Sequence, residues 1–383
     1  RNRSIPDLLS SRKTCPEETI YQLGTLDEHA SAEDLLNIVT EFIDEFKAKY
    51  GEHVHVLDWA LHLDESTPHI HERHVFDCEN KYGEVAPQQE KALEALGFDL
   101  PDPGKPLSRR NNRKITFDAA CRKMLFEIAK RHGLPLVVDA TFATPYLLRP
   151  FEHGADIVVH SLTKWLGGHG TALGGIVVDG GTFDWTDSRF SLYVEPDASY
   201  HYLRWGYDLP EGYPPFITRM RLVPLRNLGA CISPDNAWMI LQGLETLPLR
   251  MERHCANALK VAYHLKQHPK VAWVRYPGLP DDPAHAAACR MLRNGFGGMV
   301  VFGIQGGQPA GQRFIEKLGL FSHLANVGDA KSLALHPAST SHAQLSEEQQ
   351  RDAGLPPELI RLSIGIEHID DILEDLDQAL GEI

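Results

Sequence analysis

The chain has 383 residues, of which 43% are hydrophobic and 23% charged, as in an ordinary globular protein of two or three domains. No run approaches the ~18 continuous apolar residues of a membrane span, and a net charge of −14 disfavours nucleic acid and anionic membranes unless positive charge is clustered locally. Six scattered cysteines form no CxxC pair, and a chain of this size does not need a disulfide framework, so a reduced, cytoplasmic setting is favoured.

The first third of the chain predicts a small α+β region. Apolar residues at helical spacing predict a helix over 31–50, with Ser31 as N-cap and Gly51 at its end. Residues 54–63 and 69–76 read as strands joined by a turn at 64–67. A loop at 100–106, a basic run at 109–114 and a helix over 117–131 follow. Because the chain opens on Arg1 rather than Met, we expect its natural start to lie upstream, and the given sequence opens on no signal or transit peptide.

A metal-like cluster lies at the predicted hairpin, in the sequence HLDESTPHIH. His69 and His71 are two residues apart, so on a strand they point to one face, and a tight hairpin would bring His62 opposite them. Glu65 lies in the connection. Three imidazoles and a carboxylate suit Mn²⁺ or Zn²⁺. The alternative is a hairpin that is rich in histidine by chance, since the chain holds 20 histidines.

After residue 134 the pattern changes to short apolar runs separated by helical stretches. The runs LPLVVDA (134–140), ADIVVHS (155–161) and GGIVVDG (174–180) predict a mainly parallel, buried sheet. Ser233 and Pro234 open a long helical segment that continues after Pro248. The last 25 residues predict a strand, LIRLSIGI, and then a helix.

Residues with cofactor chemistry stand at the ends of these strands. Asp139 would project at a carboxyl edge, where ligands bind in open α/β sheets. Lys164 follows the next strand, between hydroxyl residues and glycines that could cradle a phosphate. Arg361 lies within an apolar strand, where a charge is costly unless it meets an anion. Taken singly, each has a plainer explanation: a helix-capping acid, a solvated lysine, and an arginine that faces water.

The second part of the chain resembles the Cys/Met metabolism PLP-dependent enzymes of fold type I, most closely the O-acetylhomoserine sulfhydrylases among them. The resemblance runs from about residue 128 to residue 383 and includes EIAKRHGLPLVVDATFATP, HSLTKWLGGHGTALGGIVVDGG and LIRLSIGIEHIDDILEDLDQAL. It implies γ-replacement of O-acetyl-L-homoserine by sulfide, with pyridoxal 5′-phosphate as cofactor, in a homo-oligomer. It also implies the roles of single residues. Lys164 would bind the cofactor covalently, Asp139 would contact its pyridine nitrogen, and Ser161 and Thr163 would contact its phosphate. Ser332 and Arg361 would bind the substrate carboxylate.

Two departures from this family pattern concern the cofactor site. Ala140 stands where the family usually has Asn. The family's glycine-containing phosphate turn, its ring-stacking aromatic residue and its Tyr/Arg pair cannot be placed in residues 1–127. We therefore expect a truncated PLP fold type I with exposed apolar sheet surface, weak cofactor binding and little or no turnover.

The first part of the chain resembles a plasmid mobilisation and recombination relaxase of the Mob/Pre type. HLDESTPHIH, RKTCPEETIYQLGTLDEH and RRNNRKITFDAACRKM carry this resemblance. It implies DNA as partner and metal ligation by His62, Glu65, His69 and His71. Residues 1–125 nevertheless hold 16 Lys and Arg against 23 Asp and Glu, a net charge of 16 − 23 = −7, and only the basic run at 109–114 could grip phosphate.

The two resemblances meet within the sequence FEIAKRHGL. We therefore expect three domains: a relaxase-like α+β fragment (1–127), a partial PLP-binding domain (128–247) and a C-terminal α+β domain of the PLP enzyme (248–383). A natural fusion and an assembly artefact would both give such a chain. We favour the artefact because each part lacks residues that its chemistry needs.

Overall fold

The structure, a computed structural model, describes residues 17–22, 31–63, 68–79, 82–101, 103–104, 106–107, 112–346, 349–350 and 355–383. Its contacts divide the chain into two units, the N-terminal unit (Arg1–Leu134) and the C-terminal unit (Pro135–Ile383). Each unit is described by itself. The expected domain boundaries near residues 127 and 247 stay predictions.

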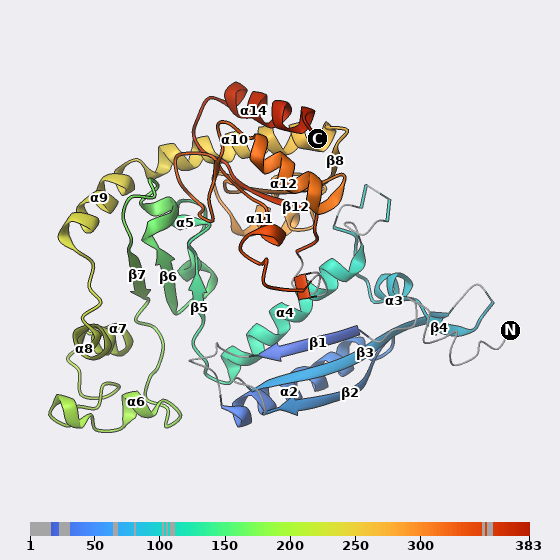
Figure 1. Cartoon of the computed structure of the whole chain (residues 1–383). Helices are drawn as coiled ribbons and strands as arrows, with labels where there is room; N and C mark the ends of the chain where they lie inside the picture. Colours follow the sequence, from blue (N-terminus) through green and yellow to red (C-terminus); the bar gives the residue numbers. More distant parts are fainter. Residues whose placement is uncertain are drawn as a thin grey trace. The chain divides into compact units, whose positions relative to one another are not determined.

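An antiparallel sheet forms the base of the N-terminal unit (Figure 1). Strand β3 (His69–Glu79) lies between β1 (Glu17–Gln22) and β2 (Val54–His62), and its far end also pairs with β4 (Val85–Pro87). The predicted strands at 54–63 and 69–76 are thus confirmed, whereas β1 was not predicted. The turn expected at residues 64–67 lies outside the described residues.

The helices of the N-terminal unit build its core against this sheet. They are α2 (Ala32–Tyr50), α3 (Gln89–Ala95) and α4 (Arg113–Arg131). The Ser31 hydroxyl accepts the N–H of Asp34 and caps α2, as expected. The apolar stripe of α2 is buried together with alternate residues of β3, namely Ile70 and Phe76. The helix expected over 117–131 begins earlier, at Arg113, inside the basic run.

A three-stranded sheet opens the C-terminal unit. Its strands are β5 (Val137–Asp139), β6 (Ile157–Ser161) and β7 (Gly175–Asp179). Strands β5 and β6 are parallel, as predicted, but β7 runs antiparallel to β6, so the expected mainly parallel sheet is mixed. The connection explains the difference. Residues 162–174 contain one short turn and no helix that could carry the chain back to the other end of the sheet.

Apolar side chains on and around this sheet are exposed. Val137 on β5 is 53% exposed, and Ile176 and Val178 on β7 are 43% and 37% exposed. Phe142 and Leu173, in the loops beside these strands, are 55% and 74% exposed. The expectation of exposed apolar sheet surface is therefore confirmed. Such a surface is typical of a face that another chain or element covers.

Several short helices and two longer helices accompany this sheet. The short elements are α5 (Thr144–Leu147), before β6, and α6 (Ser191–Val194), α7 (Pro215–Met220) and α8 (Arg226–Leu228), after β7. Helix α9 (Pro234–Glu245) begins at Ser233, whose hydroxyl accepts the N–H of Asn236. Helix α10 (Leu247–Gln267) then starts with Pro248 in its first turn, where the missing N–H costs nothing.

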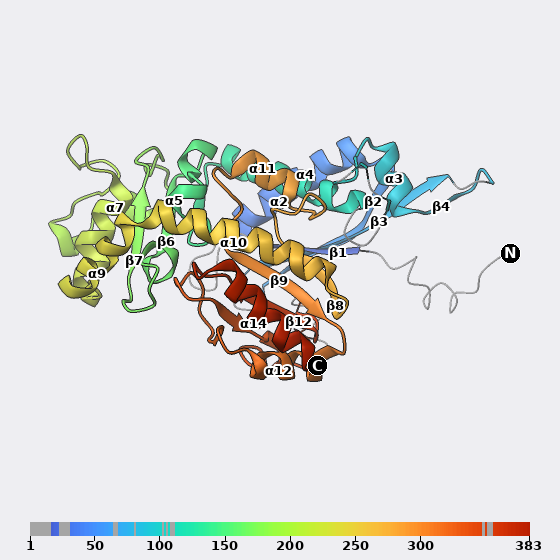
Figure 2. The ribbon, with the colours of Figure 1, turned by 90° about the horizontal axis from the view of Figure 1, so that it is seen from above.

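The second sheet of the C-terminal unit has five strands in the order β10-β11-β12-β9-β8. Their bounds are β8 Val271–Arg275, β9 Met299–Ile304, β10 Ser322–His323, β11 Leu333–Leu335 and β12 Leu359–Ser363. Helices α10, α14 (Ile369–Gly381) and α12 (Gly307–Lys317) lie side by side and share one apolar core with this sheet (Figure 2). Helix α11 (His285–Met291) lies between β8 and β9 in the chain. Among the described helices, none is long and apolar enough to cross a membrane.

Candidate functional site

A short turn after β6 presents Lys164. The strand ends at Ser161, and residues 162–166 form one helical turn that is broken at Lys164 itself, where φ is −87° and ψ is −137°. The N–H of Gly168 donates to the Lys164 carbonyl at 2.7 Å. Trp165 is fully buried on one side of the turn and contacts Phe142 at 5.4 Å between ring centroids. The buried tryptophan anchors the turn while the lysine side chain stays partly accessible.

Lys164 and Arg361, which we call the basic pair, meet at Asn326. The ammonium of Lys164 donates to Asn326 Oδ1, and Nη2 of Arg361 donates to the Asn326 carbonyl at 3.4 Å. Arg361 lies in the middle of β12, between β11 and β9, and its burial lowers the pKa of its guanidinium. Within the described residues neither cation has a carboxylate partner. Two half-buried cations without an acid between them have the chemistry to attract an anion.

Asp139 stands at the end of β5, beside the strand that leads to Lys164. Its Oδ1 accepts the N–H of Thr141 at 2.9 Å, and the Thr141 hydroxyl accepts the N–H of Ser161 at 2.8 Å. These two bonds join the carboxyl ends of β5 and β6. Asp139 is exposed, because β5 is an edge strand of the described sheet. The structure thus brings Asp139 and Ser161 to one sheet end but leaves the carboxylate open to solvent.

The hydroxyls of Thr163 and Ser332 already have partners. Thr163 Oγ1 accepts the N–H of Gly174 at 3.1 Å and faces its carbonyl at 3.4 Å. Ser332 is fully buried; its hydroxyl donates to Glu367 at 3.0 Å and accepts the N–H of Gly365 at 2.9 Å. A side-chain contact between Ser332 and a substrate would require one of these hydrogen bonds to be exchanged.

Two residues of this region were missed in the sequence. Asn326 joins the basic pair, yet nothing in its local pattern marks it. Arg250 is 5% exposed and donates to the carbonyls directly after Lys164. The sequence did hold a signal for Arg250, because it lies on the buried face of its helix between Leu247 and His254. A charge is unfavourable there unless it has a specific partner.

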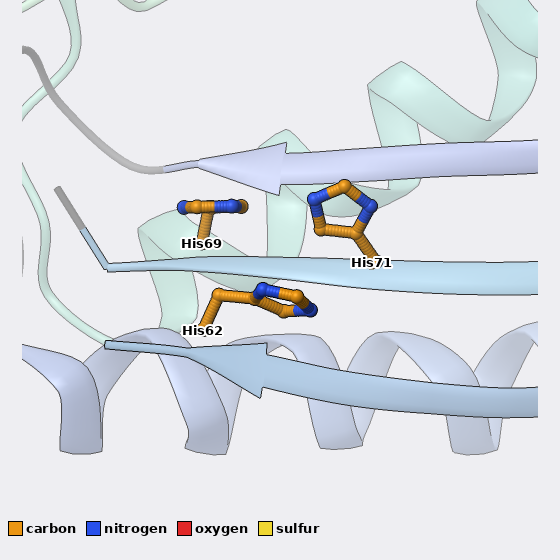
Figure 3. A group of neighbouring side chains, drawn as sticks. All are labelled: His62, His69 and His71. Carbon is orange, nitrogen blue, oxygen red and sulfur yellow. The ribbon is translucent and has the colours of Figure 1, made fainter. Parts of the chain in front are cut away.

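The three histidines His62, His69 and His71, which we call the histidine cluster, lie on one face of the N-terminal sheet (Figure 3). His62 pairs with His69 across β2 and β3, and His71 follows two residues on, so all three point to the face opposite the helices. Ring centroids are 4.5 to 5.2 Å apart. The expected convergence of these three side chains is confirmed.

The geometry of the histidine cluster fits a metal ion. One nitrogen from each ring lies within 4.8 Å of the other two. Zinc binds imidazole at ~2.0–2.1 Å, so small ring rotations would bring three ligands to one ion. His69 is 6% exposed and the other two rings are partly buried, which limits competition by water. The expected fourth ligand, Glu65, lies outside the described residues.

Part of the basic run that was expected to bind phosphate forms ion pairs within the N-terminal unit. Arg113 pairs with Glu90 at 3.5 Å and Glu94 at 2.6 Å, and Lys114 pairs with Asp118. Both basic residues lie in the first turn of α4, next to acids that neutralise them. The remainder of the run, residues 109–111, lies outside the described residues.

Comparison with known proteins gives one family match. The model of the family described as Cys/Met metabolism PLP-dependent enzyme matches residues 118–381. The O-acetyl-L-homoserine sulfhydrylase of Leptospira meyeri is 54% identical over 280 residues, which is 71% of this chain and 63% of that protein. The homocysteine synthase of Schizosaccharomyces pombe is 48% identical over 259 residues, 66% of this chain and 59% of that protein.

A solved structure is similar to about two thirds of the chain. It is a crystal structure from Campylobacter jejuni, described as an O-acetylhomoserine (thiol)-lyase with N'-pyridoxyl-lysine-5'-monophosphate. It is 43% identical, covers 67% of this chain and 61% of its own, and has a TM-score of 0.63. The chain spans about three fifths of the length of the curated relatives it matches.

Proposed function

This chain belongs to the Cys/Met metabolism PLP-dependent enzymes over residues 118–381, and on that premise we propose that it binds pyridoxal 5′-phosphate at Lys164 and acts on O-acetyl-L-homoserine with sulfide. The family resemblance seen in the sequence is thereby confirmed, and with it the α/β fold of this family, in a form with mixed sheets. The relatives that carry the sulfhydrylase and homocysteine synthase names support the choice of reaction.

The basic pair is the observation that carries this proposal. Lys164 and Arg361 come from segments almost 200 residues apart and meet at Asn326 with no acid between them. An aldehyde cofactor would meet a reactive amine there, and the carboxylate of its amino-acid substrate would meet a guanidinium. The cofactor supplies an electron sink for the carbons of the bound amino acid.

The other site residues take the roles that the family pattern implies. Lys164 binds the cofactor and moves protons on the substrate carbons. Asp139 holds the pyridine nitrogen, Ser161 and Thr163 hold the phosphate, and Arg361 with Ser332 receives the substrate carboxylate. Because Asp139 is exposed, water screens its attraction for a cation, and we expect weak cofactor binding and little turnover. A second copy of the chain, packed against this sheet, would bury the exposed apolar residues around β5 and β7.

Covalent trapping tests the cofactor assignment. The purified chain is incubated with pyridoxal 5′-phosphate, reduced with borohydride and mapped by peptide mass spectrometry. We expect modification at Lys164 at least tenfold above that at Lys260, an exposed lysine of α10. Lys164→Ala should abolish the main product and Lys260→Ala should not. Equal modification of both lysines in the wild type would refute the assignment. Robust turnover of O-acetylhomoserine would instead refute the expectation of an impaired site.

A second candidate function concerns the N-terminal unit. We propose that the histidine cluster binds Zn²⁺ or Mn²⁺, as a Mob/Pre-type relaxase fragment would, with a DNA phosphate as the group that the metal polarises. The converging imidazole nitrogens support metal binding. The ion pairs of Arg113 and Lys114 and the local net charge of −7 weigh against tight DNA contact. Metal analysis together with a supercoiled-plasmid nicking assay separates the two parts of this proposal.

A further inference from the structure

Arg250 is a buried cation whose hydrogen bonds all go to uncharged groups. It is 5% exposed, and burial lowers the pKa of its guanidinium. Its Nε donates to the Thr246 hydroxyl at 3.1 Å within α10, and within the described part of the chain it has no carboxylate partner. A charge in the interior is unfavourable unless its donors are satisfied. The groups that satisfy the donors of Arg250 therefore indicate its role.

The acceptors of Arg250 identify that task. Nη1 donates to the carbonyl of Trp165 at 2.8 Å, and Nη2 donates to the carbonyls of Leu166 at 3.2 Å and Gly243 at 2.6 Å. Trp165 and Leu166 are the two residues directly after Lys164, and Gly243 lies near the end of α9. One planar guanidinium therefore ties the turn that presents Lys164 to two helices.

The turn is built to accept this guanidinium. Its backbone is non-helical at Lys164, so the helix's own hydrogen bonds do not fully satisfy its carbonyls. At Gly168 φ is +72°, and a Cβ there would lie 2.0 Å from Nη1 of Arg250. A side chain at this position would displace the guanidinium as well as strain the backbone.

We propose that Arg250 is a positioning residue for Lys164. It fixes the carbonyls on the C-terminal side of the lysine and so holds the ammonium at Asn326, beside Arg361. This inference rests on the proposed function, because the position of the lysine has a purpose only where Lys164 binds the cofactor. Arginine is required rather than lysine, since an ammonium cannot bond three carbonyls and a hydroxyl in one plane.

The test uses the rate of covalent labelling at Lys164 by pyridoxal 5′-phosphate with borohydride trapping. We expect the rate to fall about tenfold or more in Arg250→Gln and several-fold in Arg250→Lys, relative to labelling of Lys260 in the same sample. The matched control is Arg253→Gln, on the exposed face of the same helix, which should label like the wild type. Gly168→Ala, which crowds the guanidinium while keeping it, should lower the Lys164 rate as Arg250→Lys does.

The outcomes separate this inference from the function beneath it. Near-wild-type melting of the variants with selective loss of Lys164 labelling supports the positioning role, and an equal fall in labelling at Lys164 and Lys260 in folded variants would overturn it. Folded Arg250→Gln protein labelled at the wild-type rate would also overturn it, with the proposed function intact. Wild-type protein without preference for Lys164 would overturn the proposed function and this inference together. Where Arg250→Gln fails to fold, Arg250→Lys and Gly168→Ala decide the question.

Discussion

The histidine cluster and the basic pair are assembled in opposite ways. The three histidines come from two adjacent strands, and a ten-residue stretch of sequence holds them all. Lys164 and Arg361 come from segments almost 200 residues apart, and their meeting depends on a turn, two helices and a five-stranded sheet. A local site depends on one hairpin and its support, whereas a distributed site depends on the packing of everything between its parts. The four predictions below test this contrast.

Removing two ligands should have the largest effect, and it should be confined to the N-terminal unit. In the His69→Ala, His71→Ala double variant we expect zinc affinity to fall at least ~100-fold, since one imidazole alone cannot hold the ion. Titration against a competing chelator measures it. The control is His55→Ala, on the same face of β2 and paired with Asp77 at 2.9 Å, which should retain zinc. Zinc content unchanged in the double variant would mean that the metal binds elsewhere.

Damage to the N-terminal core should disable the local site alone. Phe42 is 1% exposed between Tyr21 and Phe46, and Phe42→Ala should destabilise its unit by about 4 kcal/mol through lost burial and a cavity. Chemical denaturation with zinc binding and Lys164 labelling as separate readouts tests this. We expect zinc binding to be lost at lower denaturant concentration, while labelling at Lys164 persists. Simultaneous loss of both would show that the units unfold together.

Damage at one backbone contact should disable the distributed site. A Cβ at Gly243 of α9 would lie 2.1 Å from the carbonyl oxygen of Gly167, directly beyond the Lys164 turn. Neither backbone can give way easily, so Gly243→Ala should cost about 3 kcal/mol and reduce Lys164 labelling. Gly381→Ala, where nothing lies within 4 Å, is the control and should be neutral or slightly stabilising. If Gly243→Ala has the stability and Lys164 labelling of Gly381→Ala, the close contact between Gly243 and Gly167 does not support the site.

Acid should weaken the C-terminal unit through His254. This side chain is fully buried and its Nδ1–H donates to the Ile364 carbonyl at 2.6 Å, and burial lowers its pKa to about 4 from the ordinary 6.5. Below pH 6.5 the unfolded chain takes up a proton that the folded chain does not, so stability falls as the pH falls toward 4. Between pH 7 and pH 5 the loss should be about 2 kcal/mol.

Urea unfolding at the two pH values measures this effect. His254→Gln, which cannot titrate, should lose most of the difference between pH 7 and pH 5. His153→Gln, at an exposed histidine, should keep it. An unchanged pH dependence in His254→Gln would assign the effect to other buried histidines, such as His160 and His336, whose pKa values burial also lowers.

The same contrast explains which features the sequence could predict. The spacing of His62, His69 and His71 together with strand periodicity was enough to predict their convergence, because a hairpin fixes register locally. The sequence also predicted helix α2, with Ser31 as its N-cap and Gly51 at its end. Lys164 and Arg361 were found as residues, but Asn326, which joins them, was not, since long-range packing rather than local pattern brings it there.

Other differences have similar physical reasons. The direction of β7 depends on whether its connection crosses the sheet, and an apolar run looks the same in either direction. The commitment of the Ser332 hydroxyl to Glu367 depends on a partner 35 residues away. Strand β1 pairs with β3 across about 50 residues, and its own sequence, EETIYQ, carries only a weak alternation.

Helix α4 has a consequence for dissecting the protein into parts. The family match begins at residue 118, yet α4 begins at Arg113, and Phe117, Met124 and Ile128 are buried in the core of the N-terminal unit. A protein expressed from residue 118 onward would start inside this helix and carry its apolar stripe without a core. A cut between Leu134 and Pro135 keeps the helix with the residues that bury it. The family match and the compact units thus begin at different residues, and separate expression of the two parts should follow the boundary between the compact units.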